Sequence, residues 1–89
     1  MPQITLTILN RAGLHARAAA WLARTARQFR SDITVLHGER QASAKSILSL
    51  LGLGAGQGAL ITLRAEGEDA DRALQALGRL ASHDLEAGV

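Results

Sequence analysis

The chain has 89 residues, enough for one modest hydrophobic core, and we expect a single domain spanning residues 1–89. It contains no cysteine, which excludes disulfides and thiolate metal sites, and no apolar run near the roughly 20 residues of a membrane span. Both observations favour a cytoplasmic protein. Ten basic and eight acidic side chains leave a formal net charge of +2, too small by itself to indicate nucleic-acid binding.

The stretch before Asp32 predicts a strand followed by a helix. Apolar and threonine side chains alternate from Ile4 to Ile8, a period of two that is typical of a strand with one buried face. From about Ala16 to Phe29 the apolar residues recur at spacings of three and four, which predicts an alanine-rich helix with the inward stripe Ala19, Leu22, Ala23, Ala26 and Phe29. Another face of this helix carries Arg17, Ala20, Arg24 and Arg27, and Trp21 also lies outside the stripe.

The charges are distributed unevenly along the chain. No carboxylate side chain precedes Asp32, and the acidic residues gather in the second half. We therefore expect a basic surface around the first helix, suited to a phosphate group or to an acidic partner protein. The arginines of this stretch are Arg11, Arg17, Arg24, Arg27 and Arg30.

A hairpin is predicted next. Asp32–Leu36 has the β-branched composition of a strand, the four residues from His37 to Arg40 supply a turn, and Gln41–Ser43 returns beside the first strand.

The second half of the chain predicts two helices separated by a strand. Ser46–Leu51 is a short helix, capped by Ser43 or Ser46 and stopped by the run GLGAGQG, which we interpret as a helix stop and a flexible turn. Leu60–Ala65 alternates as a fourth strand. The last helix is expected to begin near Glu68 or Asp69, to fray after Ser82, and to turn inward Ala70, Ala73, Leu74, Leu77, Leu80 and Ala81.

The resulting order, βαββαβα, lacks a repeated βαβ unit. It predicts an α+β sandwich in which three helices cover one face of a four-stranded, mainly antiparallel sheet.

The segment Gly13–Arg17 carries the candidate chemistry, because it places His15 at the N-terminus of the first helix. Unpaired amides and the positive end of the helix dipole favour an anion there, and the Arg17 guanidinium can donate to two phosphate oxygens. A phosphoryl group on His15 would rest on the backbone amides of Ala16 and Arg17. The alternative is that His15 is only a surface residue or a helix cap.

Other chemistries are not supported by the sequence. His15, His37 and His83 lie far apart without metal-ligand spacing, and we expect His37 and His83 to be solvated residues. The run GLGAGQG ends a helix and leads into a strand, the reverse of the context of a dinucleotide-binding loop. RNA binding is disfavoured because Trp21 and Phe29 do not lie on a predicted strand. No metal or other cofactor is expected.

Three segments, GLHARAA, ASAKSILSLLGLGAGQG and AEGEDA, resemble HPr, the histidine-containing phosphocarrier family of the bacterial phosphotransferase system. The resemblance implies an HPr-like, open-faced β-sandwich that acts as a monomer and a phosphoryl carrier rather than as an independent enzyme. His15 would accept a phosphoryl group on Nδ1 from Enzyme I charged by phosphoenolpyruvate, and a IIA-type protein would receive it.

The resemblance also implies a partner surface and a regulatory serine. The surface maps onto Ala16, Arg17, Ala20, Arg24, Arg27, Ile47, Leu48 and Leu51, and an outward Trp21 would enlarge it. Ser46 lies where many members are phosphorylated by HPr kinase/phosphorylase, so a regulatory module acting through phosphorylated Ser46 is an alternative function. Sugar uptake and the nitrogen-related branch both stay open.

This chain departs from the family pattern at two positions close to the active histidine. Ala18 replaces a common proline, and Ala12 replaces a serine or asparagine.

Overall fold

The computed structural model describes residues 2–9 and 11–82, and this part of the chain forms four strands and three helices. Their order is βαββαβα, as the hydrophobic periodicity predicts. The elements are β1 (Gln3–Thr7), α1 (Ala16–Ala26), β2 (Asp32–His37), β3 (Arg40–Ser43), α2 (Ile47–Leu51), β4 (Leu60–Glu66) and α3 (Ala70–Ser82).

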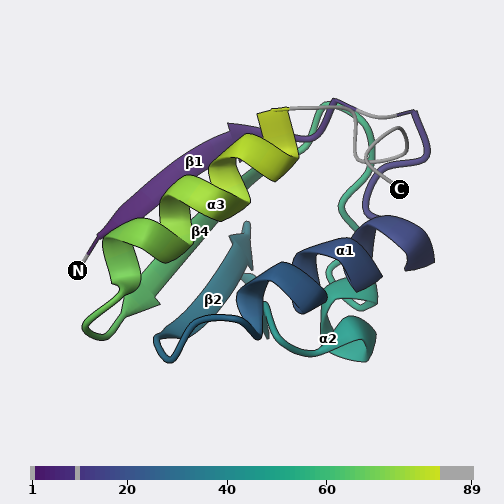
Figure 1. The fold of residues 1–89 in the computed structure, drawn as a ribbon. Helices are drawn as coiled ribbons and strands as arrows, with labels where there is room; N and C mark the ends of the chain where they lie inside the picture. Colours follow the sequence, from purple (N-terminus) through teal and green to yellow (C-terminus); the bar gives the residue numbers. More distant parts are fainter. Residues whose placement is uncertain (1, 10, 83–89) are drawn as a thin grey trace.

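The strands form one sheet in the order β1-β4-β2-β3, and each neighbouring pair is antiparallel. Helices α1 and α3 lie against one face of the sheet, and α2 lies beside α1 (Figure 1). The opposite face carries polar side chains, including Thr5 and Thr62, whose hydroxyl oxygens are 3.1 Å apart across β1 and β4. The predicted α+β, open-faced sandwich is confirmed.

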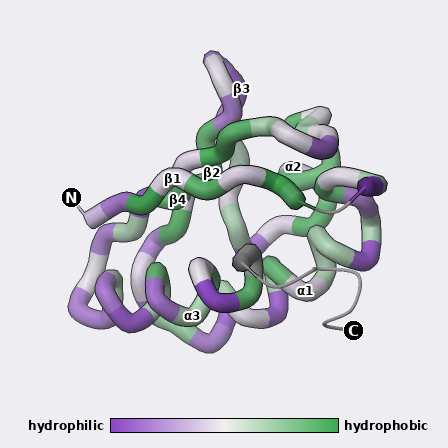
Figure 2. Tube along the Cα trace, turned by 90° about the horizontal axis from the view of Figure 1, so that it is seen from above, coloured by the Kyte–Doolittle hydropathy of each residue, from purple (hydrophilic) through white to green (hydrophobic). Residues whose placement is uncertain are grey.

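The period-two alternation explains how the sheet buries only one face. In β4, Ile61, Leu63 and Ala65 are buried, whereas Thr62 and Arg64 between them are partly exposed. Since successive side chains of a strand point to opposite faces, the buried set meets the helices and the other set meets solvent. Figure 2 shows hydrophobic segments where the helices and sheet meet.

Helix α1 ends at Ala26, so the expectation that it continues to Phe29 is wrong. After Ala26 the backbone hydrogen bonds change from the α-helical pattern to the tighter 3₁₀ pattern, in which an amide donates to the carbonyl three residues earlier. The Gln28 amide donates in this way to the Thr25 carbonyl at 3.1 Å. The next amides, of Arg30 and Ser31, donate to the Asp69 carboxylate at 2.9 and 3.0 Å. A distant carboxylate therefore turns the chain out of the helix and into β2.

The Asp69 carboxylate connects α3 to the start of β2. It also accepts a hydrogen bond from the hydroxyl of Ser31, which is buried. That bond, and then the Arg30 amide, lower the pKa of Asp69 to about 2. The Asp69 carbonyl in turn accepts the Ala73 amide at 2.9 Å, so the same residue begins α3.

The remaining elements lie close to their expected bounds. Helix α3 begins at Ala70, one residue after Asp69, and its expected inward stripe is buried or packs against the core as far as Leu80. The Ala81 side chain and the tail from residue 83 onward, including His83, lie outside the described residues. Among the helices that are described, none combines the length and hydropathy needed to cross a bilayer.

Candidate functional site

His15 is the N-cap residue of α1, with an extended backbone at φ −89° and ψ −178°. Its Nδ1 accepts a hydrogen bond from the Arg17 amide at 3.2 Å, and its carbonyl accepts the Ala19 amide at 2.8 Å. Because Nδ1 is an acceptor here, the proton of the neutral ring is on Nε2, which is the buried side of the imidazole. The nitrogen that carries a lone pair therefore faces the first turn of the helix.

The surroundings of Nδ1 favour an anion. The first turn of α1 holds no acidic residue, and the side chains of Ala16 and Arg17, the first two residues of the helix, are exposed. Helix N-termini attract negative charge through their unpaired amides and the helix dipole. The structure thus brings together the residues that the sequence proposes for phosphate chemistry: His15, Arg17 and the backbone of Ala16.

The loop before His15 rests on the loop that follows α2. The Leu14 amide donates to the Ala55 carbonyl at 2.8 Å. Gly13 has a φ of +67°, and a Cβ at this position would lie 2.6 Å from that carbonyl oxygen and 2.7 Å from the Gly56 Cα. These are backbone atoms, so only glycine fits. No residue pattern around Gly13 predicts this support for the site.

The run GLGAGQG stops α2, as expected, since α2 ends at Leu51 with Gly52 as its C-cap. Leu53 and Ala55 within the run are buried, so the turn after α2 packs against the core. Their alternation with glycines is the signal that could have indicated a packed loop.

His37 also differs from its expected place. It is the last residue of β2, half-buried, and its Nδ1 lies 3.0 Å from the Leu53 carbonyl oxygen. The expectation of a solvated turn residue is therefore wrong. The turn itself is formed by Gly38, with φ +61°, and Glu39.

Ser46 is the N-cap of α2, and its hydroxyl oxygen accepts the Ser49 amide at 3.2 Å. Of the two candidate caps, Ser46 is therefore the correct one. Ser43 lies one turn earlier, where its hydroxyl accepts the Lys45 amide at 3.2 Å.

Helices α1 and α2 together expose the residues expected to contact partners. Leu48 is 82% exposed and Leu51 37%, whereas Ile47 packs partly against the core. The expected contact residues of α1, and Arg27 at its C-cap, are exposed or half-buried: Ala16, Arg17, Ala20, Arg24 and Arg27.

Arg24 of α1 and Arg27, the C-cap of this helix, make contacts that the sequence did not predict. The Arg27 Nε donates to the Lys45 carbonyl at 3.0 Å and so connects the end of α1 to the chain before α2. The Arg24 guanidinium lies 5.6 Å from the centre of the Trp21 ring, a cation–π distance. Trp21 is half-buried and lies outside the buried stripe, as the periodicity predicts.

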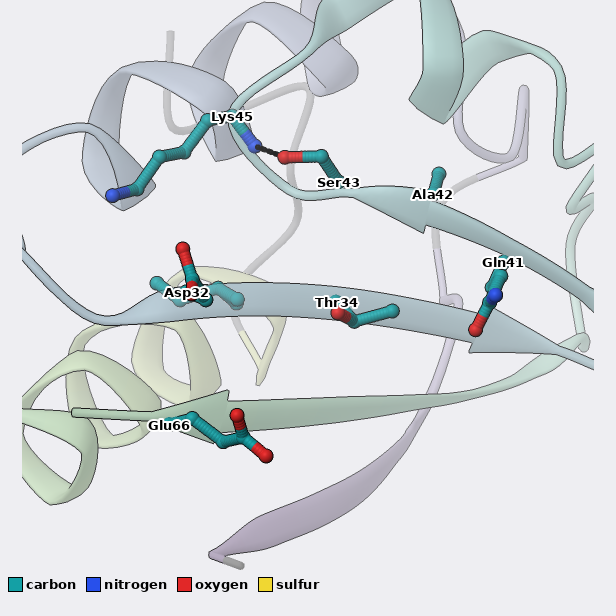
Figure 3. Close-up of a pocket in the computed structure, with 8 residues that line it drawn as sticks. Asp32, Thr34, Gln41, Ala42, Ser43, Lys45 and Glu66 are labelled. Carbon is teal, nitrogen blue, oxygen red and sulfur yellow. Dashed lines mark hydrogen bonds between the residues drawn. The ribbon is translucent and has the colours of Figure 1, made fainter.

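A separate cavity of about 500 Å³ opens on the polar face of the sheet (Figure 3). Asp32 and Glu66, which pair across β2 and β4, contribute carboxylates to it, and neither His15 nor Arg17 lines it. With two carboxylates against one lysine, Lys45, its lining does not favour phosphate. Within residues 2–9 and 11–82, no group of three or more potential ligand residues could hold a metal ion.

Comparison with known proteins agrees with this arrangement. The family model described as the PTS HPr component phosphorylation site matches residues 2–83. The phosphocarrier protein NPr of Shewanella violacea is 53% identical over 72 residues, covering 81% of this chain and 79% of that protein. The phosphocarrier protein HPr of Mycoplasma capricolum is 40% identical over 77 residues, covering 86% of each.

A crystal structure of HPr-C-His from Thermoanaerobacter tengcongensis superposes with a TM-score of 0.92. The two proteins are 40% identical, and the match covers 97% of each chain.

Proposed function

This chain belongs to the PTS HPr family, and from that premise we propose that it carries a phosphoryl group on Nδ1 of His15, received from Enzyme I and passed to a IIA-type protein. The observation that carries the proposal is the place of Nδ1 at the N-terminus of α1, 3.2 Å from the Arg17 amide. The lone pair on this atom is the nucleophile. Its bond to phosphorus forms as the bond between phosphorus and the donor breaks.

The first turn of α1 then holds the transferred group. The Arg17 amide, which donates to Nδ1 before transfer, donates to a phosphoryl oxygen afterwards, and the exposed Arg17 guanidinium neutralises the remaining charge. Each charge-assisted hydrogen bond contributes about 1.5–3 kcal/mol. Phosphoryl transfer depends mainly on positioning and charge stabilisation, so the carrier needs no cofactor and its partners supply the rest of the catalytic groups.

Partners dock on the exposed side of α1 and α2. The apolar part is formed by Leu48 and Leu51, and Arg17 and Arg24 supply positive charge close to it. Such a surface suits an acidic protein with an apolar centre. We propose that the chain works as a cytoplasmic monomer that engages one partner at a time.

Regulation through Ser46 is a second candidate function. Its hydroxyl is at the beginning of α2, beside the exposed Leu48, so a phosphate there would place charge within the partner surface. Incubation with HPr kinase/phosphorylase and ATP should add one phosphate to the wild type and none to Ser46→Ala. An unchanged mass of the wild type would contradict this second function.

The main proposal is tested with radiolabelled phosphoenolpyruvate and Enzyme I from the sugar branch and from the nitrogen-related branch. We expect an acid-labile label on the wild type and on Ser46→Ala, the matched control, and none on His15→Ala. The Enzyme I that labels faster identifies the branch. Label retained by His15→Ala, or no label from either Enzyme I, would contradict phosphoryl transfer at His15.

A further inference from the structure

We propose that His37 and Arg40, at the β2–β3 turn, are positioning residues that hold His15 in its reactive geometry through the loop after α2. This inference rests on the proposed phosphoryl transfer at His15. Neither side chain needs to contact the phosphoryl group. They act through a continuous series of hydrogen bonds and backbone contacts that ends at the residue before His15.

The first step connects the hairpin to residues 52–53. The imidazole Nδ1 of His37 lies 3.0 Å from the Leu53 carbonyl oxygen, and Arg40 Nη1 donates to the Gly52 carbonyl at 3.2 Å. Two consecutive carbonyls of the loop are therefore held by side chains of the hairpin. A carbonyl only accepts, so Nδ1 of His37 carries a proton, which it does in the charged ring and in one neutral tautomer.

The second step connects the loop to the site. The Ala55 carbonyl accepts the Leu14 amide at 2.8 Å, and Gly13 approaches the same carbonyl so closely that no side chain fits between the two loops. Leu14 is covalently bonded to His15, and it is itself buried. A rotation of the peptides at residues 52–55 would therefore move the backbone that begins α1.

The buried side chains of the loop cannot provide this orientation alone. Leu53 and Ala55 are anchored in the core, which fixes how deeply the loop is inserted. Apolar contacts have no strong directional preference, whereas a hydrogen bond to a carbonyl favours one orientation of the peptide plane. The amides of Leu53 and Gly54 donate to the carbonyls of Leu50 and Leu51 at 3.2 and 3.4 Å, and the bonds from His37 and Arg40 hold the carbonyl side of the same peptides. Together they orient the chain that leads to the Ala55 carbonyl.

The experiment compares His37→Phe, which removes the donor, with His37→Asn, whose side-chain amide can place an N–H near the former Nδ1. We expect His37→Phe to lower kcat for phosphorylation by Enzyme I about tenfold, because reaction rates fall steeply when the reacting atoms are misplaced. KM should stay unchanged, since the exposed surface of α1 and α2 is intact. His37→Asn should recover most of the rate.

A second readout does not depend on transfer. Hydrogen exchange at the Leu14 amide should accelerate in His37→Phe and in Arg40→Met. Because Arg40 is exposed, its replacement should keep the fold, and Arg40→Met therefore serves as the test if His37→Phe is unstable. Ser31→Ala is the matched control for general destabilisation, because it breaks a buried bond beyond the other end of α1. It should change neither kcat nor exchange at Leu14 well below its melting temperature.

The proposal is overturned if His37→Phe and Arg40→Met leave the Leu14 exchange rate and kcat at wild-type values. It is equally overturned if His37→Asn is as impaired as His37→Phe, or if Ser31→Ala shows the same losses. Failure of the wild type to accept phosphate would contradict the proposed function instead, and the Leu14 exchange rates would still decide whether the hairpin positions the loop.

Discussion

Replacing Gly13 by alanine tests whether the close approach of two loops holds the site. The added Cβ must tolerate a φ of +67°, which costs about 1–2 kcal/mol for a residue with a side chain. It also meets backbone atoms of Ala55 and Gly56 at 2.6 and 2.7 Å, and such overpacking costs about 1–3 kcal/mol more. We expect Gly13→Ala to lower the free energy of unfolding by about 2–5 kcal/mol, the sum of these two terms.

Gly38 provides the matched control. Its φ is +61°, close to that of Gly13, but a Cβ there would have no neighbour within 4 Å. Gly38→Ala should therefore lower the free energy of unfolding only by the conformational part, about 1–2 kcal/mol.

Urea denaturation gives the free energy of unfolding of each variant, and the difference between the two values is the steric cost at Gly13. Phosphorylation by Enzyme I should fall on the order of 10²-fold in Gly13→Ala, because the clash displaces Leu14 and His15, and should fall much less in Gly38→Ala, which strains the hairpin turn without a clash. Equal free energies of unfolding for Gly13→Ala and Gly38→Ala, or a wild-type transfer rate in Gly13→Ala, would contradict the claim that this close approach holds the site.

Three further predictions concern charge. Since hydrogen bonds hold the pKa of Asp69 at about 2, below its ordinary 3.8, its contribution to stability is complete above pH 3.8 and is lost as the pH falls toward 2. Asp69→Asn should thus be less stable than the wild type at pH 6 and nearly equal near pH 2 in denaturation curves; a constant difference would contradict this. Arg24→Glu should slow association with Enzyme I about tenfold at low salt, whereas Arg72→Glu on α3, the control, should not slow it to this extent. Equal effects at both positions would exclude a basic docking surface. Arg17→Ala should hydrolyse its phosphohistidine faster than the wild type in a label-release assay, and an unchanged half-life would remove Arg17 from the site.

The local parts of the fold follow from the sequence. Alternation places the strands because each one buries a single face, and the spacing of alanines in α1 predicts its buried stripe. The place of His15 at the start of α1 is predictable for the same reason, since it lies where the period of two has ended and the helical spacing begins. These features need no knowledge of distant contacts.

The remaining features depend on residues that are far apart in the chain. Helix α1 stops at Ala26 because Asp69 accepts the amides of Arg30 and Ser31, and no pattern near Ala26 indicates this. The contact between Gly13 and Ala55 likewise arises only when the loops after β1 and α2 meet. Hydrophobic periodicity reports which face is buried, but it does not report which carbonyl accepts from which side chain.

The nitrogen atom that carries the phosphate tests the central claim most directly. The protein labelled with ¹⁵N-histidine can be phosphorylated by Enzyme I and its imidazole nitrogens observed by NMR. We predict a nitrogen–phosphorus coupling at Nδ1 of His15, with His37 unmodified. Phosphate on Nε2 of His15, on His37, or on a residue other than histidine would contradict the claim that the first turn of α1 receives the transferred group.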